Sequence, residues 1–163
     1  MSEFQEAFLD IETTGLSASE CDITVVGIYI TNGSRNKLIQ LVGERVTGDN
    51  LLNSLQGTGI IYTYNGMRFD LPFIRQRLGV DLTGMFKHCD LMFYCWDNNL
   101  FGGMKRVEAQ LNIPRRFKEL NGLEAIRLWW RYINNYDEKA LSLLLEYNKE
   151  DVINLKTLRD RLL

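Results

Sequence analysis

The first third of the chain alternates between short apolar runs and turn residues, a pattern typical of β-strands. Strands are predicted where apolar and β-branched residues cluster, at 7–12, 23–30, 37–42 and 60–64. The turn Asn32-Gly33-Ser34 separates the second run from the third and predicts a hairpin connection. A short helix is expected at 49–55, and Gly57-Thr58-Gly59 ends it before the fourth strand.

The second half of the chain has helical periodicity instead. Helices are predicted at 71–78, where Gly79 follows, and at 104–111, 123–133 and 137–162. One face of the last helix carries a stripe formed by Leu141, Leu144, Leu145, Asn148, Val152, Leu155 and Leu162. Three strands, a helix, a strand and then helices predict an α/β domain with a mixed central β-sheet flanked by α-helices.

Length and composition describe a single folded domain. The 163 residues fit one domain, 1–163, and 45% hydrophobic with 25% charged residues argue against disorder. The start MSEFQE is not typical of a signal peptide, and no apolar run is long enough to span a bilayer. Three cysteines without CxxC spacing do not indicate a disulfide framework. We therefore expect a soluble, cytoplasmic protein without membrane contact.

Charge is distributed unevenly along the chain. The net charge of −2 excludes a histone-like, purely electrostatic grip on nucleic acid. Residues 1–30 nevertheless carry six acidic side chains and no Lys or Arg, whereas 101–131 carry seven basic and three acidic ones. The basic stretch is either a solvated helix face or a docking surface for a polyanion whose phosphate meets metal at the acidic end.

Two carboxylates stand close together in the first predicted strand. Side chains at positions i and i+2 of a strand point to the same face, so Asp10 and Glu12 are expected side by side. Such a pair repels unless a cation or a proton intervenes, and hard divalent cations take oxygen ligands. The same alternation also fits an ordinary strand end that faces solvent while Leu9 and Ile11 turn inward. The pattern alone leaves both interpretations open.

A second motif connects the fourth predicted strand to the helix at 71–78. It reads Tyr64-Asn65-Gly66-Met67-Arg68-Phe69-Asp70-Leu71-Pro72-Phe73. Asp70 is a good helix N-cap, and proline is tolerated in the first turn that follows. Capping is the simpler interpretation of Asp70, although a carboxylate at a helix start can also ligate a metal. The aromatic residues Tyr62, Tyr64 and Phe69 flank Asp70 and are expected near any site there.

A third motif, Tyr147-Asn148-Lys149-Glu150-Asp151, lies on the last helix. Tyr147 and Asp151 are four residues apart, so they share one flank of the apolar stripe, at the rim of the helix–sheet contact. A boundary tyrosine and a solvated aspartate would show the same spacing. If the helices pack beside the first strand, however, Asp10, Glu12, Asp70 and Asp151 converge. Their four negative charges would match two divalent cations, which can clamp a phosphodiester.

These three motifs, in this order, resemble the DEDD superfamily of 3′–5′ exonucleases, tyrosine subclass. The resemblance is carried by D-x-E at Asp10, N-G-x-x-F-D ending at Asp70 and Y-x-x-x-D ending at Asp151, and it covers nearly the whole chain. Further stretches resemble the YprB-like, ribonuclease H-like family of exonucleases: Asp90-Leu91, Met104-Lys105-Arg106-Val107-Glu108, Leu111-Asn112-Ile113-Pro114-Arg115 and Tyr147-Asn148-Lys149-Glu150-Asp151.

The resemblance implies a ribonuclease H-like fold and two Mg²⁺ or Mn²⁺ ions as cofactor. It implies that Asp10 bridges both ions, that Glu12 and Asp151 complete the shell of the first, and that Asp70 serves the second. Tyr147 would orient the attacking water. A tyrosine pKa near 10 argues against a full role as general base at neutral pH.

The residues expected to hold substrate come from the resemblance and from the basic stretch. By resemblance, the backbone from Thr13 to Leu16 meets the terminal nucleotide, and Asn65 supports the site or touches substrate. The candidate substrate-binding residues are Thr13, Thr14, Leu16, Asn65, Phe69, Lys105, Arg115 and Arg116.

Other conspicuous residues receive no role. His88 is the single histidine, which argues against the histidine subclass of the superfamily and against a histidine-based triad. The spacing of His88 and the three cysteines fits no usual zinc pattern. Trp129 and Trp130 could stack on bases, but adjacent helical residues diverge, so at least one is expected in the core.

The expected function is a metal-dependent 3′–5′ exonuclease that hydrolyses phosphodiester bonds at DNA or RNA ends. The expected partner is nucleic acid with a single-stranded 3′ end. Two alternatives stay open: a structure-selective endonuclease on the same fold, and a non-catalytic nucleic-acid-binding or assembly module. Because all four carboxylates and Tyr147 are present, nothing in the sequence indicates that the catalytic set has decayed.

Overall fold

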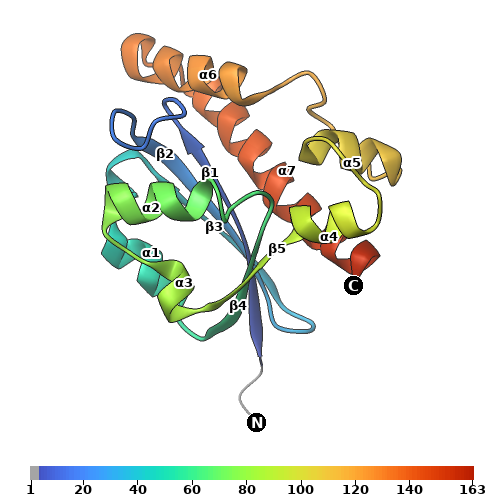
Figure 1. The fold of residues 1–163 in the computed structure, drawn as a ribbon. Coiled ribbons are helices and arrows are strands. Elements are labelled where there is room, and N and C mark those ends of the chain that lie inside the picture. Colours follow the sequence, from blue (N-terminus) through green and yellow to red (C-terminus); the bar gives the residue numbers. More distant parts are fainter. Residues whose placement is uncertain (1–3) are drawn as a thin grey trace.

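The computed structural model describes residues 4–163, which form a five-stranded sheet with helices on both faces (Figure 1). The strands are β1 (Gln5–Thr13), β2 (Ile23–Thr31), β3 (Asn36–Val42), β4 (Thr58–Thr63) and β5 (Lys87–Asp90). The helices are the 3-10 turn η1 (Gly43–Arg45), α1 (Gly48–Ser54), α2 (Asp70–Leu78), α3 (Leu82–Met85), α4 (Leu91–Asp97), α5 (Met104–Gln110), α6 (Gly122–Asn135) and α7 (Glu138–Leu162).

The strand order β3-β2-β1-β4-β5 places β1 at the centre of the sheet. β1 pairs with β2 in antiparallel fashion along nearly its whole length, from Glu6 to Thr13. Its parallel pairing with β4 runs only from Gln5 to Phe8. The second half of β1 therefore has a strand neighbour on one side only, and its other side is open to residues from elsewhere in the chain.

The two faces of β1 enter different cores, because side chains alternate along a strand. Ala7, Leu9 and Ile11 pack with buried residues of α1, α2 and α3 on one face of the sheet. Phe8 faces the other side and packs with residues of α4, α5 and α7. Figure 1 shows these two groups of helices on opposite sides of the sheet.

The long helix α7 crosses the sheet beside β1 and β2 and also packs against α6 and α4. Its buried residues are Ala140, Leu144, Tyr147, Asn148, Val152, Asn154, Leu155 and Leu158. Asp137 caps its first turn, where the side chain accepts a hydrogen bond from the backbone N of Ala140. Burial of this face fixes the register of α7 against β1, and hence the position of every side chain it presents there.

The mixed sheet flanked by helices confirms the predicted fold class. The four predicted strands and five predicted helices are all present, with ends shifted by one or two residues. The sequence pattern did not predict β5, α3, α4 or η1. Each has seven residues or fewer, too short for a periodicity to be distinctive.

Among the described residues, no helix combines the length and the apolar character needed to cross a bilayer.

Candidate metal-dependent active site

The carboxylates of β1 lie beneath α7 rather than in solvent. Leu9 and Ile11 turn into one core, as the alternation predicts, so Asp10 and Glu12 share the opposite face. That face is covered as well, and only 8% of Glu12 is exposed. The interpretation of this segment as a solvent-facing strand end is therefore wrong.

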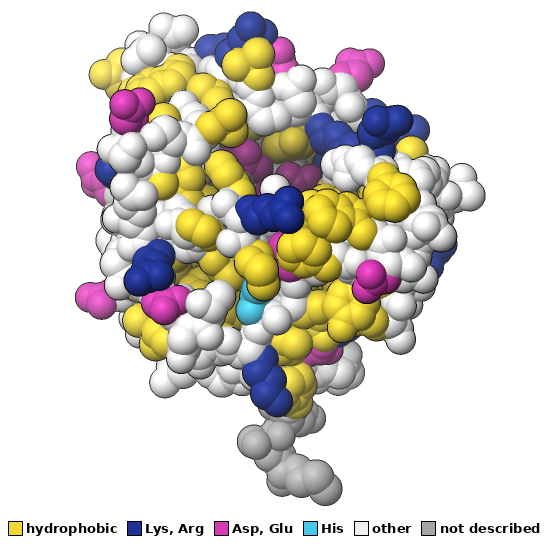
Figure 2. Space-filling view, in the orientation of Figure 1, with side chains coloured by type: hydrophobic (Ala, Val, Ile, Leu, Met, Phe, Trp, Pro, Cys, Tyr) yellow, Lys and Arg dark blue, Asp and Glu magenta, His cyan; other side chains and the backbone are white. Residues whose placement is uncertain are grey.

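Asp151 of α7 completes a cluster of three carboxylates. One ligand oxygen each from Asp10, Glu12 and Asp151 lie within 4.8 Å of one another, close enough to share a metal ion. Figure 2 shows acidic side chains at the bottom of a hollow in the upper half of the molecule, with Lys and Arg side chains along its right rim. The structure thus brings together residues that lie more than 130 positions apart in the sequence.

Asp70 reaches the same place through the open side of β1. Its Oδ2 accepts a hydrogen bond of 3.1 Å from the backbone N of Ile11, the residue between Asp10 and Glu12. Only 4% of Asp70 is exposed. The prediction that Asp70 caps α2 is wrong, because the cap position is Phe69 and no side chain caps that helix. The carboxylate is turned towards β1 instead.

The pKa values of Asp10, Glu12 and Asp70 reflect burial first and the crowding of negative charge second. Burial, and then the charges of Asp151, Glu12 and Asp70, raise the pKa of Asp10 well above its ordinary value. The pKa of Glu12 is also well raised, by burial and by Asp151 and Asp70. Burial raises the pKa of Asp70 to about 7. Hard divalent cations bind oxygen ligands and carry the positive charge that would balance these carboxylates, so the cluster suits such a cation.

Tyr147 lies beside the carboxylates on α7, one turn before Asp151. It is 6% exposed, so it is buried in the helix–sheet contact rather than placed at its rim. Burial, together with Asp151, Glu12 and Asp10, raises its pKa well above the ordinary value. Its hydroxyl is therefore protonated at neutral pH and available as a hydrogen-bond donor. Lys105 of α5 lies over the ring, with Nζ 4.9 Å from the centroid.

Asn148 is a residue of the site that sequence reasoning placed on the apolar stripe but gave no role. Its Nδ2 lies 3.3 Å from the backbone O and 3.4 Å from Oδ2 of Asp10, and its Oδ1 accepts a hydrogen bond from Gln40 of β3. Gly27 of β2 makes room for this amide, because a Cβ there would lie 2.1 Å from Oδ1 of Asn148. The signal in the sequence was a polar residue at a position of the apolar stripe. The structure shows that Asn148 is fully buried, and buried polar groups need hydrogen-bond partners.

Arg115 lies in the interior and not on the predicted basic surface. Only 3% of its side chain is exposed, and it donates two hydrogen bonds of 2.6 Å to Glu108 and one of 2.6 Å to Asp151. Arg115 was predicted to bind substrate as part of a docking surface. That prediction is wrong, because its guanidinium lies in the interior and already binds Glu108 and Asp151.

A cavity of about 350 Å³ opens next to Glu12 and gathers several predicted substrate-binding residues. Thr13, Leu16 and Phe69 line it, together with Leu123 and Ile126 of α6. Thr14 does not line this cavity, and its hydroxyl accepts a hydrogen bond from the backbone N of Asp22. The walls are largely apolar, while Glu12 contributes the edge nearest to the carboxylate cluster.

Asp90 holds the turn that leads from β4 to Asp70. Its carboxylate accepts hydrogen bonds from the backbone N of Asn65, Met67 and Met92. Asn65 adopts a left-handed conformation, with φ 60°, and its Oδ1 is buried without a hydrogen-bond partner among the described residues. Asp90 was quoted in the family resemblance without a role, and the structure shows it as the anchor of this turn.

Two of the aromatic residues expected near Asp70 point elsewhere. Tyr62 stacks on Phe8, with ring centroids 5.0 Å apart, and the hydroxyl of Tyr64 donates to the backbone O of Gly102. Phe69 is the one that reaches the cavity beside Glu12. Trp129 is 8% exposed and Trp130 is 44% exposed, which confirms that one of the pair belongs to the core.

Arg116 and the cysteines complete the set of residues singled out in the sequence. Arg116 is exposed and lies over the ring of Phe117, with its Cζ 4.9 Å from the centroid. Among residues 4–163, no cluster of three metal-ligating side chains includes a cysteine or His88.

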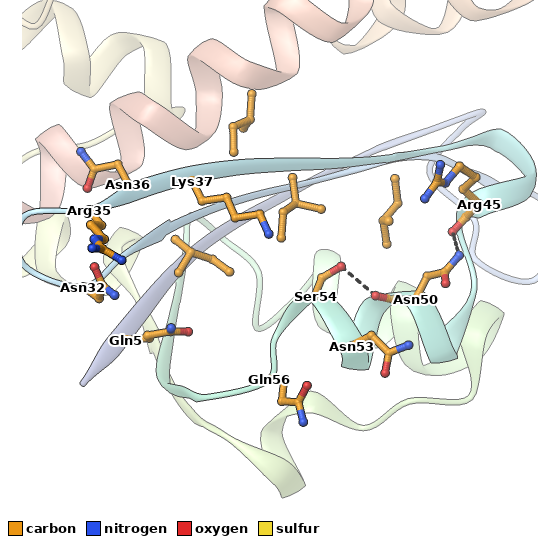
Figure 3. Close-up of a pocket in the computed structure, with 14 residues that line it drawn as sticks. Gln5, Asn32, Arg35, Asn36, Lys37, Arg45, Asn50, Asn53, Ser54 and Gln56 are labelled. Atoms are coloured by element: carbon orange, nitrogen blue, oxygen red, sulfur yellow. Dashed lines mark hydrogen bonds between the residues drawn. The ribbon is translucent and has the colours of Figure 1, made fainter. Parts of the chain in front are cut away.

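A large cavity lies away from the carboxylates. It has a volume of about 900 Å³ and runs between β3 and α1 (Figure 3). Arg35, Lys37 and Arg45 line it together with amide side chains, and its described lining contains no Asp or Glu. This lining offers amide oxygens but no carboxylate, and its three cationic side chains repel a divalent cation, so the candidate active site is the acidic hollow.

A sequence profile and solved structures match this chain. The profile RNase_H_2 of the RNase H superfamily matches residues 7–163. No curated protein matches the sequence. Among solved structures, the family B DNA polymerase of the archaeon Pyrobaculum calidifontis superposes with a TM-score of 0.74 at 16% identity. That match covers 98% of this chain and 24% of the polymerase chain.

Two structures of NrnC from Brucella melitensis are similar over most of both chains. The NrnC structure bound to pGG gives a TM-score of 0.65 at 19% identity, covering 98% of this chain and 72% of that one. The structure with bound Mg²⁺ gives 0.64 at 18% identity, covering 99% and 73%. At these identities the likeness establishes the fold, which is that of ribonuclease H.

Proposed function

Because this chain belongs to the RNase H superfamily, we propose that it is a metal-dependent 3′–5′ exonuclease of the DEDD type, tyrosine subclass. The proposal includes the finer, YprB-like family assignment made from the sequence motifs. The observation that carries it is the carboxylate cluster of Asp10, Glu12 and Asp151, with Asp70 bonded to the backbone between the first two. NrnC, which shares the fold, has been solved with bound Mg²⁺ and with pGG.

The carboxylates are the proposed ligands of two divalent cations, Mg²⁺ or Mn²⁺. Asp10 would contact both ions, Glu12 and Asp151 would hold the first, and Asp70 would hold the second. Cations there would neutralise charge developing on the reacting phosphate and lower the pKa of the attacking water. Their binding would also relieve the repulsion that, together with the larger effect of burial, raises the pKa values of Asp10 and Glu12.

Tyr147 orients the attacking water in this proposal. Like any tyrosine hydroxyl it is protonated at neutral pH, and the raised pKa holds that proton more firmly, so it would donate a hydrogen bond rather than accept a proton. Lys105 lies over the same ring at the edge of the carboxylate cluster. Its ammonium group would contact a phosphate oxygen of the bound strand.

The cavity beside Glu12 is the proposed position of the 3′-terminal nucleotide. Its volume of about 350 Å³ and its apolar walls from Leu16, Phe69, Leu123 and Ile126 suit one nucleobase. Thr13, Thr14 and Asn65 would contact the sugar and phosphate nearby. Exposed Arg116 would meet the strand further from its end, and Arg115 takes no direct part in substrate binding.

The decisive experiment follows a 5′-labelled oligonucleotide, as DNA and as RNA, with Mg²⁺ or Mn²⁺ and with EDTA. We expect a ladder of products shortened from the 3′ end, which EDTA abolishes. Asp151→Asn should lose activity, and Asp160→Asn, at an exposed position on the same helix, should keep it. Cleavage in EDTA, or of a circular single strand, would contradict the proposal, and no cleavage of any end would favour a binding module.

A further inference from the structure

The buried Arg115 donates a hydrogen bond to Asp151, one of the proposed metal ligands. Arg115 Nη2 lies 2.6 Å from Oδ1 of Asp151 and 2.6 Å from Oε1 of Glu108, while Nε lies 2.6 Å from Oε2 of Glu108. The side chains of Arg115 and Glu108 are 3% and 1% exposed. A hydrogen-bonded ion pair in so dry a place has one geometry, because no water can replace either partner.

The pair is itself fixed by the elements around it. Glu108 lies on α5 and also accepts a hydrogen bond of 3.2 Å from Nδ2 of Asn154 on α7. Glu150 of α7 accepts hydrogen bonds from the backbone N of Arg116 and Phe117, which ties the segment carrying Arg115 to the same helix. The contacts of Glu150 and Asn154, which lie before and after Asp151 on α7, therefore hold Arg115 and Glu108 against this helix.

The consequence for Asp151 is a restricted orientation. Oδ1 is occupied by Arg115, and among the described residues no donor contacts Oδ2. An aspartate on a helix otherwise has several rotamers, and only some of them face β1. Arg115 selects one of them, in which an oxygen of Asp151 lies within 4.8 Å of ligand oxygens of Asp10 and Glu12.

We propose that the buried Arg115–Glu108 pair is a positioning device that presets Asp151 for divalent cation binding. The inference rests on the proposed function, in which Asp151 is a metal ligand. Arg115 is a positioning residue here, since it acts through Asp151 and does not touch the substrate. Partners that orient a ligand in this way typically change metal affinity by about 10–100-fold when they are removed.

Positioning and simple charge compensation predict different results. If Arg115 served only as a counter-charge, changes that leave the net charge of the Arg115–Glu108 pair as it is would leave cation affinity unchanged. If it positions Asp151, its removal weakens cation binding, because the ligand must then be ordered at the moment of binding. If it served only to stabilise the fold, the affinity of the folded protein would not change.

The test is calorimetric titration of Mn²⁺ into the wild-type chain and the double variant Arg115→Met/Glu108→Gln. The double change removes both buried charges at similar size, an exchange that proteins often tolerate, and the amide oxygen introduced at position 108 can still accept a hydrogen bond from Asn154. We expect Mn²⁺ affinity to fall by about 10–100-fold and turnover to recover at saturating Mn²⁺. The matched control is Arg159→Met/Glu6→Gln, an ion pair at the far end of β1, which should leave Mn²⁺ affinity unchanged.

The single variant Arg115→Lys keeps the inference testable if the double variant does not fold. Arg115→Lys keeps the charge but lacks the planar fork that joins both carboxylates, so Mn²⁺ affinity should still fall by at least about threefold. Equal or tighter Mn²⁺ binding by the folded variants would overturn the inference and leave the proposed function intact. A wild-type chain that binds no Mn²⁺ and cleaves no strand would overturn both.

Discussion

Replacing Asp70 by asparagine should stabilise the metal-free protein at alkaline pH. Asp70 is 4% exposed, and burial raises its pKa from 3.8 to about 7. The folded protein therefore holds this proton more tightly than the unfolded chain does. The resulting contribution to stability is fully present below about pH 4, and it is lost as the pH rises through about 7.

The size of the effect follows from the same two pKa values. A pKa that moves from 3.8 to about 7, at about 1.4 kcal/mol for each unit, corresponds to about 4 kcal/mol. Asparagine never ionises, and its Oδ1 can accept the hydrogen bond that Ile11 N donates to Oδ2. Asp70→Asn should thus approach about 4 kcal/mol of extra stability near pH 8, or a melting temperature higher by roughly 8–16 °C.

The assay is thermal and urea unfolding in EDTA from acidic to alkaline pH. We expect the curves of wild type and Asp70→Asn to meet near pH 4 and to separate above pH 6, while Asp97→Asn, at an exposed position, follows wild type throughout. Saturating Mg²⁺ should reverse the order at pH 8, because only wild type offers the full ligand set. A variant no more stable than wild type at pH 8 in EDTA would refute the reasoning.

Two further substitutions test parts of the site. Tyr147→Phe keeps the buried ring but removes the hydroxyl, so single-turnover cleavage should slow by roughly 10²–10³-fold with little change in affinity or melting temperature, and a rate within about threefold of wild type would remove Tyr147 from the site. Gly27→Ala places a Cβ 2.1 Å from Oδ1 of Asn148 and should expel that amide from Asp10, costing about 1–3 kcal/mol of stability and much of the activity. Gly103→Ala, which has open space around its Cβ, should leave both measurements unchanged.

Local patterns were sufficient to predict the parts of the site that depend on one element. Strand alternation placed Asp10 and Glu12 on one face, and helical spacing placed Tyr147 beside Asp151. The sequence could not say that this face is covered, because the covering helix lies more than 125 residues further along the chain. The alternative of a solvent-facing strand end was therefore equally compatible with the pattern.

The errors concern residues whose partners are distant or lie in loops. The sequence pattern suggests Asp70 as an N-cap, but α2 begins at Asp70 itself, and the carboxylate turns to Ile11 because β1 lacks a strand neighbour there. Arg115 stands in a basic stretch, yet the segment carrying it folds back between α5 and α7, where Glu108 and Asp151 capture it. Asn148 fits the stripe by spacing, and only the sheet shows that it lies against Gly27.

The joining of β1 to α7 makes the carboxylate cluster sensitive to partial unfolding. Asp10 and Asp151 lie far apart in sequence, so no local segment retains the site when α7 detaches from the sheet. The opening free energy of α7, measurable by native-state hydrogen exchange at Leu144 and Val152, therefore sets the fraction of molecules that hold a complete site. Because the cluster joins the first strand to the last helix, we expect it to form only after the sheet and α7 have met during folding.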